Sequence, residues 1–489
     1  MSLKQFLVIH PYLFAVFPII FLFAYNIDEV PATDLILPML AAIIGTLILF
    51  LLLRLITKNS NKAAIVTSLL LILFFSYGHV RDVISSLGIN GLNIGQVHIS
   101  NQFIFAPLWL VLFITGAFLV IRAHRDFSTS TKFLNVVAIA LVAISLVNIG
   151  IYEVRTLNRV PEETNKGSTS LSSGNPHSLP DIYYIILDAY ARRDTLKSYF
   201  GYDNSEFINY LTNKGFYVAT NSYSNYGDTF FSLPSSLNMD YLTVDEMANE
   251  AKRLEMIGNN RVSQFLKEKG YRYIFVGGGI NFKGIAKYTD EYFVYKSESL
   301  LKKSDFADSL ISTTALSPFT IFLQGFWGES DRKAVFYAFD KLVDIPDIEE
   351  PTFVYAHMRP PHPPFIFDRN GNHPKYNIFE GTGNIWQSSM HRERYVDQLV
   401  FINKKVEAMV DEILARSKVP PIIILQGDHG VWWERGGGKD MHNAILNAYY
   451  LPEKDKQNLY DTISPVNSFR MLFNLYFDTD FELLKDETP

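Results

Sequence analysis

Two acidic side chains and a histidine follow apolar runs of strand length in the second half of this chain. Asp188 follows the run Ile182–Leu187, and the pair Asp428–His429 follows the run Ile422–Leu425. Gly430 comes next and lets the backbone bring both side chains of the pair round one centre. A carboxylate beside an imidazole is a common half of a divalent-metal site, whereas a lone aspartate at a strand end is often only a helix N-cap. Together these residues predict a metal site.

Three further histidines lie in the same half of the chain. His357 ends a third apolar run, His362 follows it within the segment HMRPPHPP, and His442 lies in KDMHNAILNAYYLP. An isolated histidine is usually a polar residue whose hydrogen bonds are satisfied, so His357 either lines the site or only packs beside it. Because all three follow or flank the same set of strands, we expect them near the predicted metal site.

Thr229 and Ser232 supply hydroxyl groups at the start of a predicted helix. A turn at Gly227–Asp228 precedes them, so the helix should begin near Thr229. A hydroxyl or a phosphate at a helix N-terminus feels the positive end of the helix dipole. A divalent cation on the same oxygen would lower the hydroxyl pKa enough for attack near pH 7. The alternative is that one of these residues merely caps the helix.

The elements that must position these residues follow from the hydrophobic pattern. Buried strands that alternate with helices predict a mostly parallel sheet covered by helices on both faces. In such sheets the ligand site lies at the carboxyl ends of the strands, which is where the acidic and histidine residues occur. The predicted strands are 182–187, 271–276, 352–357 and 422–425, and the predicted helices are 196–215, 261–269 and 395–416.

Residues 1–155 have the composition of a membrane domain. They hold 15 charged side chains, about 10%, whereas the other 334 residues hold 79, about 24%. A helix needs about 20 largely apolar residues to cross the hydrocarbon core. Five stretches qualify, although the third is short and ends before Gly78: Phe6–Tyr25, Leu35–Ile56, Ala63–Tyr77, Phe103–Val120 and Phe133–Ile151.

The distribution of Lys and Arg predicts the orientation of these spans. With the N-terminus inside, the outer loops carry only Arg81, and an odd number of spans places the rest of the chain on the outer face. Residues 156–180 are rich in Ser, Asn, Gly and Pro and predict a flexible linker, so 181–489 is expected to be an extracytoplasmic catalytic domain. The inner segments carry seven basic residues: Lys4, Arg54, Lys58, Lys62, Arg122, Arg125 and Lys132.

Composition also excludes several kinds of chemistry. The chain has no cysteine, which excludes disulfides, thiolate zinc sites, a cysteine nucleophile and iron–sulfur clusters. Its formal net charge of −6 gives no basic patch, so we expect no nucleic-acid partner.

With these motifs in this order, the chain resembles the alkaline phosphatase superfamily. The resemblance is to its sulfatase-like branch, which includes lipoteichoic acid synthases and lipid A phosphoethanolamine transferases. It rests on five spans before a soluble domain, on PDIYYIILDAYAR with Asp188, on TFFSLP with Thr229, and on GDHG with Asp428 and His429. It implies an alkaline-phosphatase-like α/β domain in which these four residues hold one divalent metal ion. Three oxygens and one nitrogen favour manganese or zinc.

The resemblance also implies a reaction. Thr229 would attack a phosphodiester of a membrane lipid or an envelope glycan, and His362 and His442 would bind the transferred phosphate or a second metal and protonate the leaving alcohol. A formylglycine sulfatase is not expected, because Ser236 stands where the sulfatase motif requires Arg. Two alternatives stay open, a hydrolase that releases the group to water and a non-catalytic membrane protein that retains the fold.

Three other features carry weaker expectations. Arg192 and Lys439 either clamp phosphate or lie at the surface. The apolar segment Ala315–Trp327 is either a membrane-facing loop or part of the core.

Overall fold

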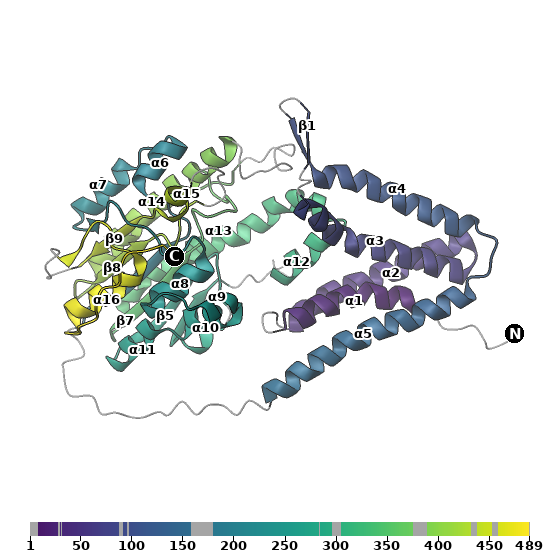
Figure 1. Ribbon diagram of the computed structural model, residues 1–489, viewed down its shortest axis with the longest axis horizontal. Coiled ribbons are helices and arrows are strands. Elements are labelled where there is room, and N and C mark those ends of the chain that lie inside the picture. Colours follow the sequence, from purple (N-terminus) through teal and green to yellow (C-terminus); the bar gives the residue numbers. More distant parts are fainter. Residues whose placement is uncertain are drawn as a thin grey trace. The chain divides into compact units, whose positions relative to one another are not determined.

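The chain divides into two compact units (Figure 1). The first holds helices α1 to α5 together with α12 and η4, and the second holds a seven-stranded sheet and the helices that cover it. The computed structural model describes residues 8–27, 30, 32–87, 91–94, 97–157, 179–282, 284–295, 305–374, 389–431, 438–451 and 458–488.

Each of the five predicted spans corresponds to a helix of the first unit. Four of these helices are long and apolar enough to cross a membrane, and α1 is a shorter apolar helix. The third predicted span was too short, because α3 continues through Gly78 to Ser86. The bounds are α1 His10–Tyr25, η1 Ala32–Leu35, α2 Ile36–Thr57, α3 Ser60–Ser86, α4 Asn101–Arg122 and α5 Ser128–Leu157, with a hairpin of β1 Gly91–Ile94 and β2 Val97–Ser100 before α4.

The first unit also contains a segment from the second half of the chain. Phe306 and Leu310 share a buried apolar cluster with residues of α1, and the N–H of Ala315 donates to the carbonyl of Phe74 in α3 (2.8 Å). The beginning of the apolar segment Ala315–Trp327 therefore packs on helices of the first unit. The elements of this region are α12 Asp305–Thr313, η4 Ser317–Phe319 and the start of α13 Thr320–Asp344.

The second unit is built on a mostly parallel sheet with the strand order β4-β9-β8-β3-β7-β5-β6. The central strand β3 is parallel to both β7 and β8, and β5 is parallel to β6 and β7. Among the described strands of this sheet, β9 alone runs antiparallel to both of its neighbours, β4 and β8. The predicted parallel sheet is confirmed, with strands β3 Ile182–Leu187, β4 Tyr217–Val218, β5 Arg272–Gly278, β6 Glu291–Val294, β7 Thr352–Met358, β8 Ile422–Gln426 and β9 Asn447–Tyr450.

Helices cover both faces of this sheet because β3 is apolar on both sides. Tyr183, Ile185 and Leu187 pack on one face against α6, α7, α13 and α14. The alternate residues of β3 pack on the other face against α8, α10, α11 and α16. The bounds are α6 Arg193–Phe200, α7 Ser205–Asn213, α8 Thr229–Asn238, α9 Val244–Ala248, α10 Glu250–Gly258, α11 Arg261–Glu268, η3 Ile285–Lys287, η5 Ile345–Asp347, α14 Ser389–Arg416, α15 Gly438–Asn443 and α16 Pro465–Tyr476.

The helix predicted over 196–215 is in fact two helices, α6 and α7. Gly201 has φ +65° and ends α6 as a left-handed C-cap, a conformation that glycine adopts without steric cost. The apolar spacing continues across this break, which is why the sequence pattern alone suggested one helix.

Candidate active site

The parallel strands β3, β7 and β8 end side by side, so Asp188 and Asp428 lie at the same edge of the sheet. Ile186 of β3 pairs with His357 of β7 and with Gln426 of β8, so the turns that follow these strands meet. A Cβ on Gly427 would lie 2.6 Å from the carbonyl oxygen of Tyr190. Glycine at this position therefore allows the turn after β8 to approach the turn after β3.

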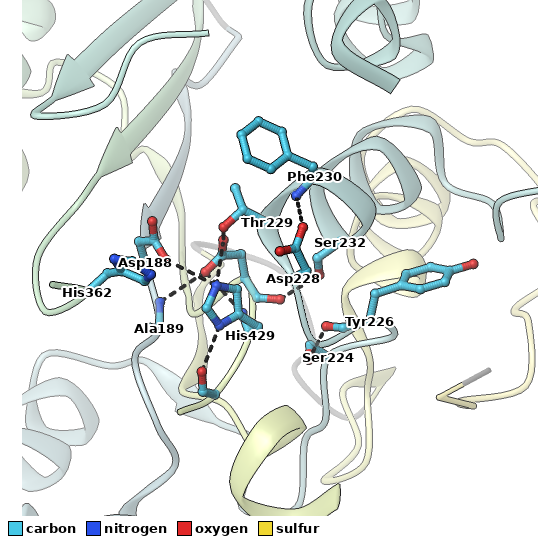
Figure 2. A network of polar contacts seen from close by, with 12 residues as sticks. Asp188, Ala189, Ser224, Tyr226, Asp228, Thr229, Phe230, Ser232, His362 and His429 are labelled. Atoms are coloured by element: carbon cyan, nitrogen blue, oxygen red, sulfur yellow. Dashed lines mark hydrogen bonds and ion pairs between the residues drawn. The ribbon is translucent and has the colours of Figure 1, made fainter. Parts of the chain in front are cut away.

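Asp188 and His429 lie at the centre of the site (Figure 2), together with Asp428. The Nε2 atom of His429 lies 3.3 Å from Oδ1 of Asp188 and 3.9 Å from Oδ2 of Asp428. All three residues are at most 3% exposed. Two buried carboxylates and an imidazole thus share a small volume from which water is largely excluded.

Hydrogen bonding fixes which nitrogen of His429 faces the carboxylates. Nδ1 lies 2.7 Å from the carbonyl of Gly430, and since a carbonyl only accepts, Nδ1 carries the proton. Nε2 therefore needs a second proton or a cation to face two carboxylates. Burial alone would lower the pKa of His429, but the charges of Asp428 and Asp188 outweigh it and raise this pKa to about 10.

The same geometry fits a divalent metal ion. Oδ1 of Asp188 is buried without a hydrogen bond, although Nε2 of His429 is close to it. Burial raises the pKa of Asp188, yet the nearby His362, His357 and His429 bring it below its ordinary value, so the carboxylate stays ionised. An ionised carboxylate with an unpaired oxygen, beside the lone pair of an imidazole held by its other nitrogen, is a typical ligand arrangement for zinc or manganese.

His357 and His362 also lie close to Asp188. Nε2 of the fully buried His357 lies 3.4 Å from Oδ2 of Asp188. The backbone N–H of His362 donates to the carbonyl of Asp188 (3.0 Å), and its ring lies 6.0 Å from that of His429. Among the described residues, two groups have ligand atoms within 4.8 Å of one another, Asp188–His362–His429 and Asp188–His357–Asp428.

The two candidate hydroxyls at the start of α8 make different contacts. Asp228 caps the helix by accepting the N–H of Phe230 (2.8 Å). The hydroxyl of Thr229 donates to Oδ2 of Asp428 (2.7 Å), inside the carboxylate and imidazole cluster. The hydroxyl of Ser232 donates instead to the backbone carbonyl of Asp428 (2.5 Å). Thr229 therefore faces the site, and Ser232 braces the helix against the Asp428 turn.

His442 and Arg192 are the other predicted site residues that the structure describes. Among the described residues, His442 belongs to neither group of close ligand atoms, and its backbone carbonyl accepts the N–H of Gly430 (2.7 Å). Arg192 is buried and makes a forked contact with Asp194, so its guanidinium holds a local structure. The side chain of Lys439 lies outside the described residues.

The backbone contacts to Asp428 had no signal in the sequence. The backbone N–H of Ala189 donates to Oδ1 of Asp428 (3.1 Å), and the N–H of His429 donates to the same oxygen (3.0 Å). A backbone donor leaves no trace in residue types, so only the fold reveals it.

The sulfatase family model matches residues 180–461, more than half of the chain. The zinc complex of the C-terminal periplasmic domain of EcEptC from Escherichia coli is 12% identical, with a TM-score of 0.41, over 62% of this chain and 83% of that one. The integral membrane protein lipooligosaccharide phosphoethanolamine transferase A from Neisseria meningitidis is 13% identical, with a TM-score of 0.38, over 96% and 95%. A putative sulfatase from Bacteroides fragilis is 14% identical, with a TM-score of 0.38, over 63% and 75%. No curated protein matches the chain.

Proposed function

Because the chain belongs to the sulfatase family, and so is an enzyme of the alkaline phosphatase superfamily, we propose that it is a membrane-anchored phosphotransferase with Thr229 as its nucleophile. The observation that carries the proposal is the hydrogen bond from the Thr229 hydroxyl to Asp428, at the N-terminus of α8. The proposed substrates are phosphodiesters of an envelope lipid or glycan, and the proposed catalytic domain is 181–489 on the outer face of the membrane.

A divalent ion, manganese or zinc, would be held by Asp188, Thr229, Asp428 and His429. When bound, it supplies positive charge that lowers the pKa of a neighbouring hydroxyl and neutralises phosphate oxygens. The fit rests on Oδ1 of Asp188, which is buried without a hydrogen bond, and on the orientation of the His429 ring.

The residues of the chain account for each proton in the first half-reaction. Oδ2 of Asp428 accepts the proton of the Thr229 hydroxyl as its oxygen bonds to phosphorus. The bond from phosphorus to the leaving alcohol breaks, and the protonated imidazole of His362 or His442 gives that alcohol a proton. The N-terminus of α8 presents the positive end of its dipole to the negative charge that develops on phosphate oxygens. A second alcohol then takes the group from Thr229 by the reverse sequence.

Replacement of Thr229 tests the nucleophile. Full-length chain in detergent micelles with Mn²⁺ or Zn²⁺ would be given a phospholipid with a labelled phosphorylated headgroup, and peptides containing residue 229 would be analysed by mass spectrometry. Thr229→Ala should abolish the covalent adduct and reduce turnover by about 10³-fold or more. Thr229→Ser, which keeps a hydroxyl, should retain the adduct.

Ser232→Ala is the matched control. It removes a hydroxyl from the same helix face but should leave the adduct in place, with a loss of stability of about 1 kcal/mol because one hydrogen bond disappears. An adduct on Ser232, or full turnover by Thr229→Ala, would refute the assignment. Product analysis with and without a glycan acceptor separates transfer from the alternative of hydrolysis.

A further inference from the structure

Ala189 holds an unusual backbone conformation directly after the proposed metal ligand Asp188. Its φ is +58°, in the left-handed region where the Cβ of an L-residue crowds the backbone. Glycine would adopt this conformation without that cost, so the surrounding structure must hold Ala189 in place. Strain of this kind persists only where neighbouring contacts over-determine the backbone.

A single side chain supplies two of those contacts. The hydroxyl of Tyr395, from α14, donates to the carbonyl of Ala189 (2.8 Å) and accepts the N–H of Ala191 (3.1 Å). Tyr395 is fully buried, and burial raises the pKa of its hydroxyl above the ordinary value, so the proton needed for the first bond stays in place. The phenol therefore bridges an acceptor and a donor on either side of residue 190.

The turn after β3, which Tyr395 holds, also links the Asp188 backbone to the Asp428 carboxylate. The N–H of Ala189 donates to Oδ1 of Asp428 (3.1 Å), as Figure 2 shows. The N–H of Asp188 donates to the carbonyl of Met358 (2.9 Å), and its carbonyl accepts the N–H of His362 (3.0 Å). A rotation of the Ala189 backbone would thus release Asp428 and move Asp188 at the same time.

We propose that Tyr395 is a positioning residue, which holds Ala189 in its left-handed conformation and so fixes the spacing of the Asp188 and Asp428 carboxylates for a divalent ion. This rests on the proposed metal site. Residues that orient metal ligands from outside the ligand set typically change metal affinity by about 10–100-fold when they are replaced.

The test compares two fully buried tyrosines whose hydroxyls hold different groups. Tyr190 is also fully buried, and its hydroxyl also donates once and accepts once, to Asn403 and from Asn204. Zn²⁺ affinity of the full chain would be measured by competition with a chromophoric chelator, and the Co²⁺ form would be followed by its visible absorption. Tyr395→Phe should weaken Zn²⁺ binding by about 10–100-fold and alter the Co²⁺ spectrum, while Tyr190→Phe should leave both near those of the unmodified chain. Equal effects of the two variants would overturn the proposal.

Ala189→Gly provides a rescue. In the double variant Tyr395→Phe with Ala189→Gly, the turn no longer needs a clamp, because glycine adopts a positive φ freely. Most of the lost Zn²⁺ affinity should return, and if Tyr395→Phe alone fails to fold, the double variant should fold. A double variant no better than Tyr395→Phe would overturn the link through Ala189.

A measurement without metal separates this inference from the proposed function. In the metal-free chain, Tyr395→Phe removes the acceptor of the Ala191 N–H. Amide hydrogen exchange in 188–192 should therefore be faster in Tyr395→Phe than in the unmodified chain, and it should be unchanged in Tyr190→Phe. If the unmodified chain binds no Zn²⁺, the proposed metal site fails. If it binds Zn²⁺ and exchange in 188–192 is unchanged by Tyr395→Phe, the role of Tyr395 alone fails.

Discussion

Gly427 lies between the last residue of β8 and the Asp428–His429 pair, and a methyl group there would strike the backbone. The added Cβ would stand 2.6 Å from the carbonyl oxygen of Tyr190 and 3.4 Å from Cβ of Ile445. A carbonyl in a buried turn cannot rotate away as a side chain would. The turn after β3 would therefore move away from β8 and stretch the Ala189–Asp428 hydrogen bond.

The expected cost of Gly427→Ala has two parts. Overpacking of a buried site costs about 1–3 kcal/mol, and a lost hydrogen bond to a carboxylate costs about 1.5–3 kcal/mol. A total of about 2.5–6 kcal/mol would lower the melting temperature by roughly 4–10 °C in a domain of about 300 residues. Thermal unfolding and Zn²⁺ titration of the full chain would measure the two effects together.

Gly270→Ala is the control for Gly427→Ala. Gly270 has φ +90° and open space around its Cβ direction, so alanine should cost about 1–2 kcal/mol through backbone strain without touching the site. Zn²⁺ affinity should fall in Gly427→Ala and stay unchanged in Gly270→Ala. Equal Zn²⁺ affinities in the two variants would show that close approach at Gly427 does not set the site geometry.

Four other outcomes follow from the structure. The pKa of His429 is raised to about 10, so a cation that binds near pH 7 should displace about one proton from this ring. Calorimetry in buffers of different ionisation enthalpy would detect the released proton. If no proton is released, His429 is not a ligand of the cation. In the metal-free chain, the stabilisation from protonated His429 should be complete below its unfolded pKa of about 6.5 and disappear as the pH rises through about 10. Chelation should lower the melting temperature, since a cation at 100 times its Kd contributes about 2.7 kcal/mol, and an unchanged melting temperature would count against the metal site. Arg192→Lys should destabilise the fold by about 1–3 kcal/mol, because the fork to Asp194 and the bond to the Ser222 carbonyl are disturbed, yet leave KM unchanged; a raised KM would restore the phosphate-clamp interpretation.

The buried strands were the most predictable part of the fold. A parallel strand covered on both faces must be apolar at every position, so Ile182–Leu187 is visible as an uninterrupted run and its bounds match β3. The polar residue that follows such a run lies at the sheet edge by necessity. This is why Asp188 and Asp428 could be placed near each other from sequence, although 240 residues separate them.

Elements defined by long-range contacts were not predictable in the same way. The third span was expected to end at Tyr77 because Gly78 follows, yet α3 continues to Ser86. A Cβ on Gly78 would lie only 2.3 Å from the carbonyl oxygen of Ser312, so this glycine permits close packing of the segment 305–319 and does not end the helix. The antiparallel strand β9 includes polar Asn447 and lacked a continuous apolar run.

The contacts of Thr229 and Ser232 distinguish these two hydroxyls, which the sequence alone did not. The two residues are three positions apart and so share a face of α8, displaced by about 4.5 Å along its axis. Because of this displacement, the hydroxyl of Thr229 contacts the carboxylate of Asp428, whereas the hydroxyl of Ser232 contacts the backbone carbonyl of the same residue. A hydroxyl bonded to a carboxylate has a proton acceptor for nucleophilic attack, whereas one bonded to a backbone carbonyl has only a structural partner. The direction of α8 relative to the Asp428 turn, which no local pattern encodes, thereby favours Thr229 as the nucleophile.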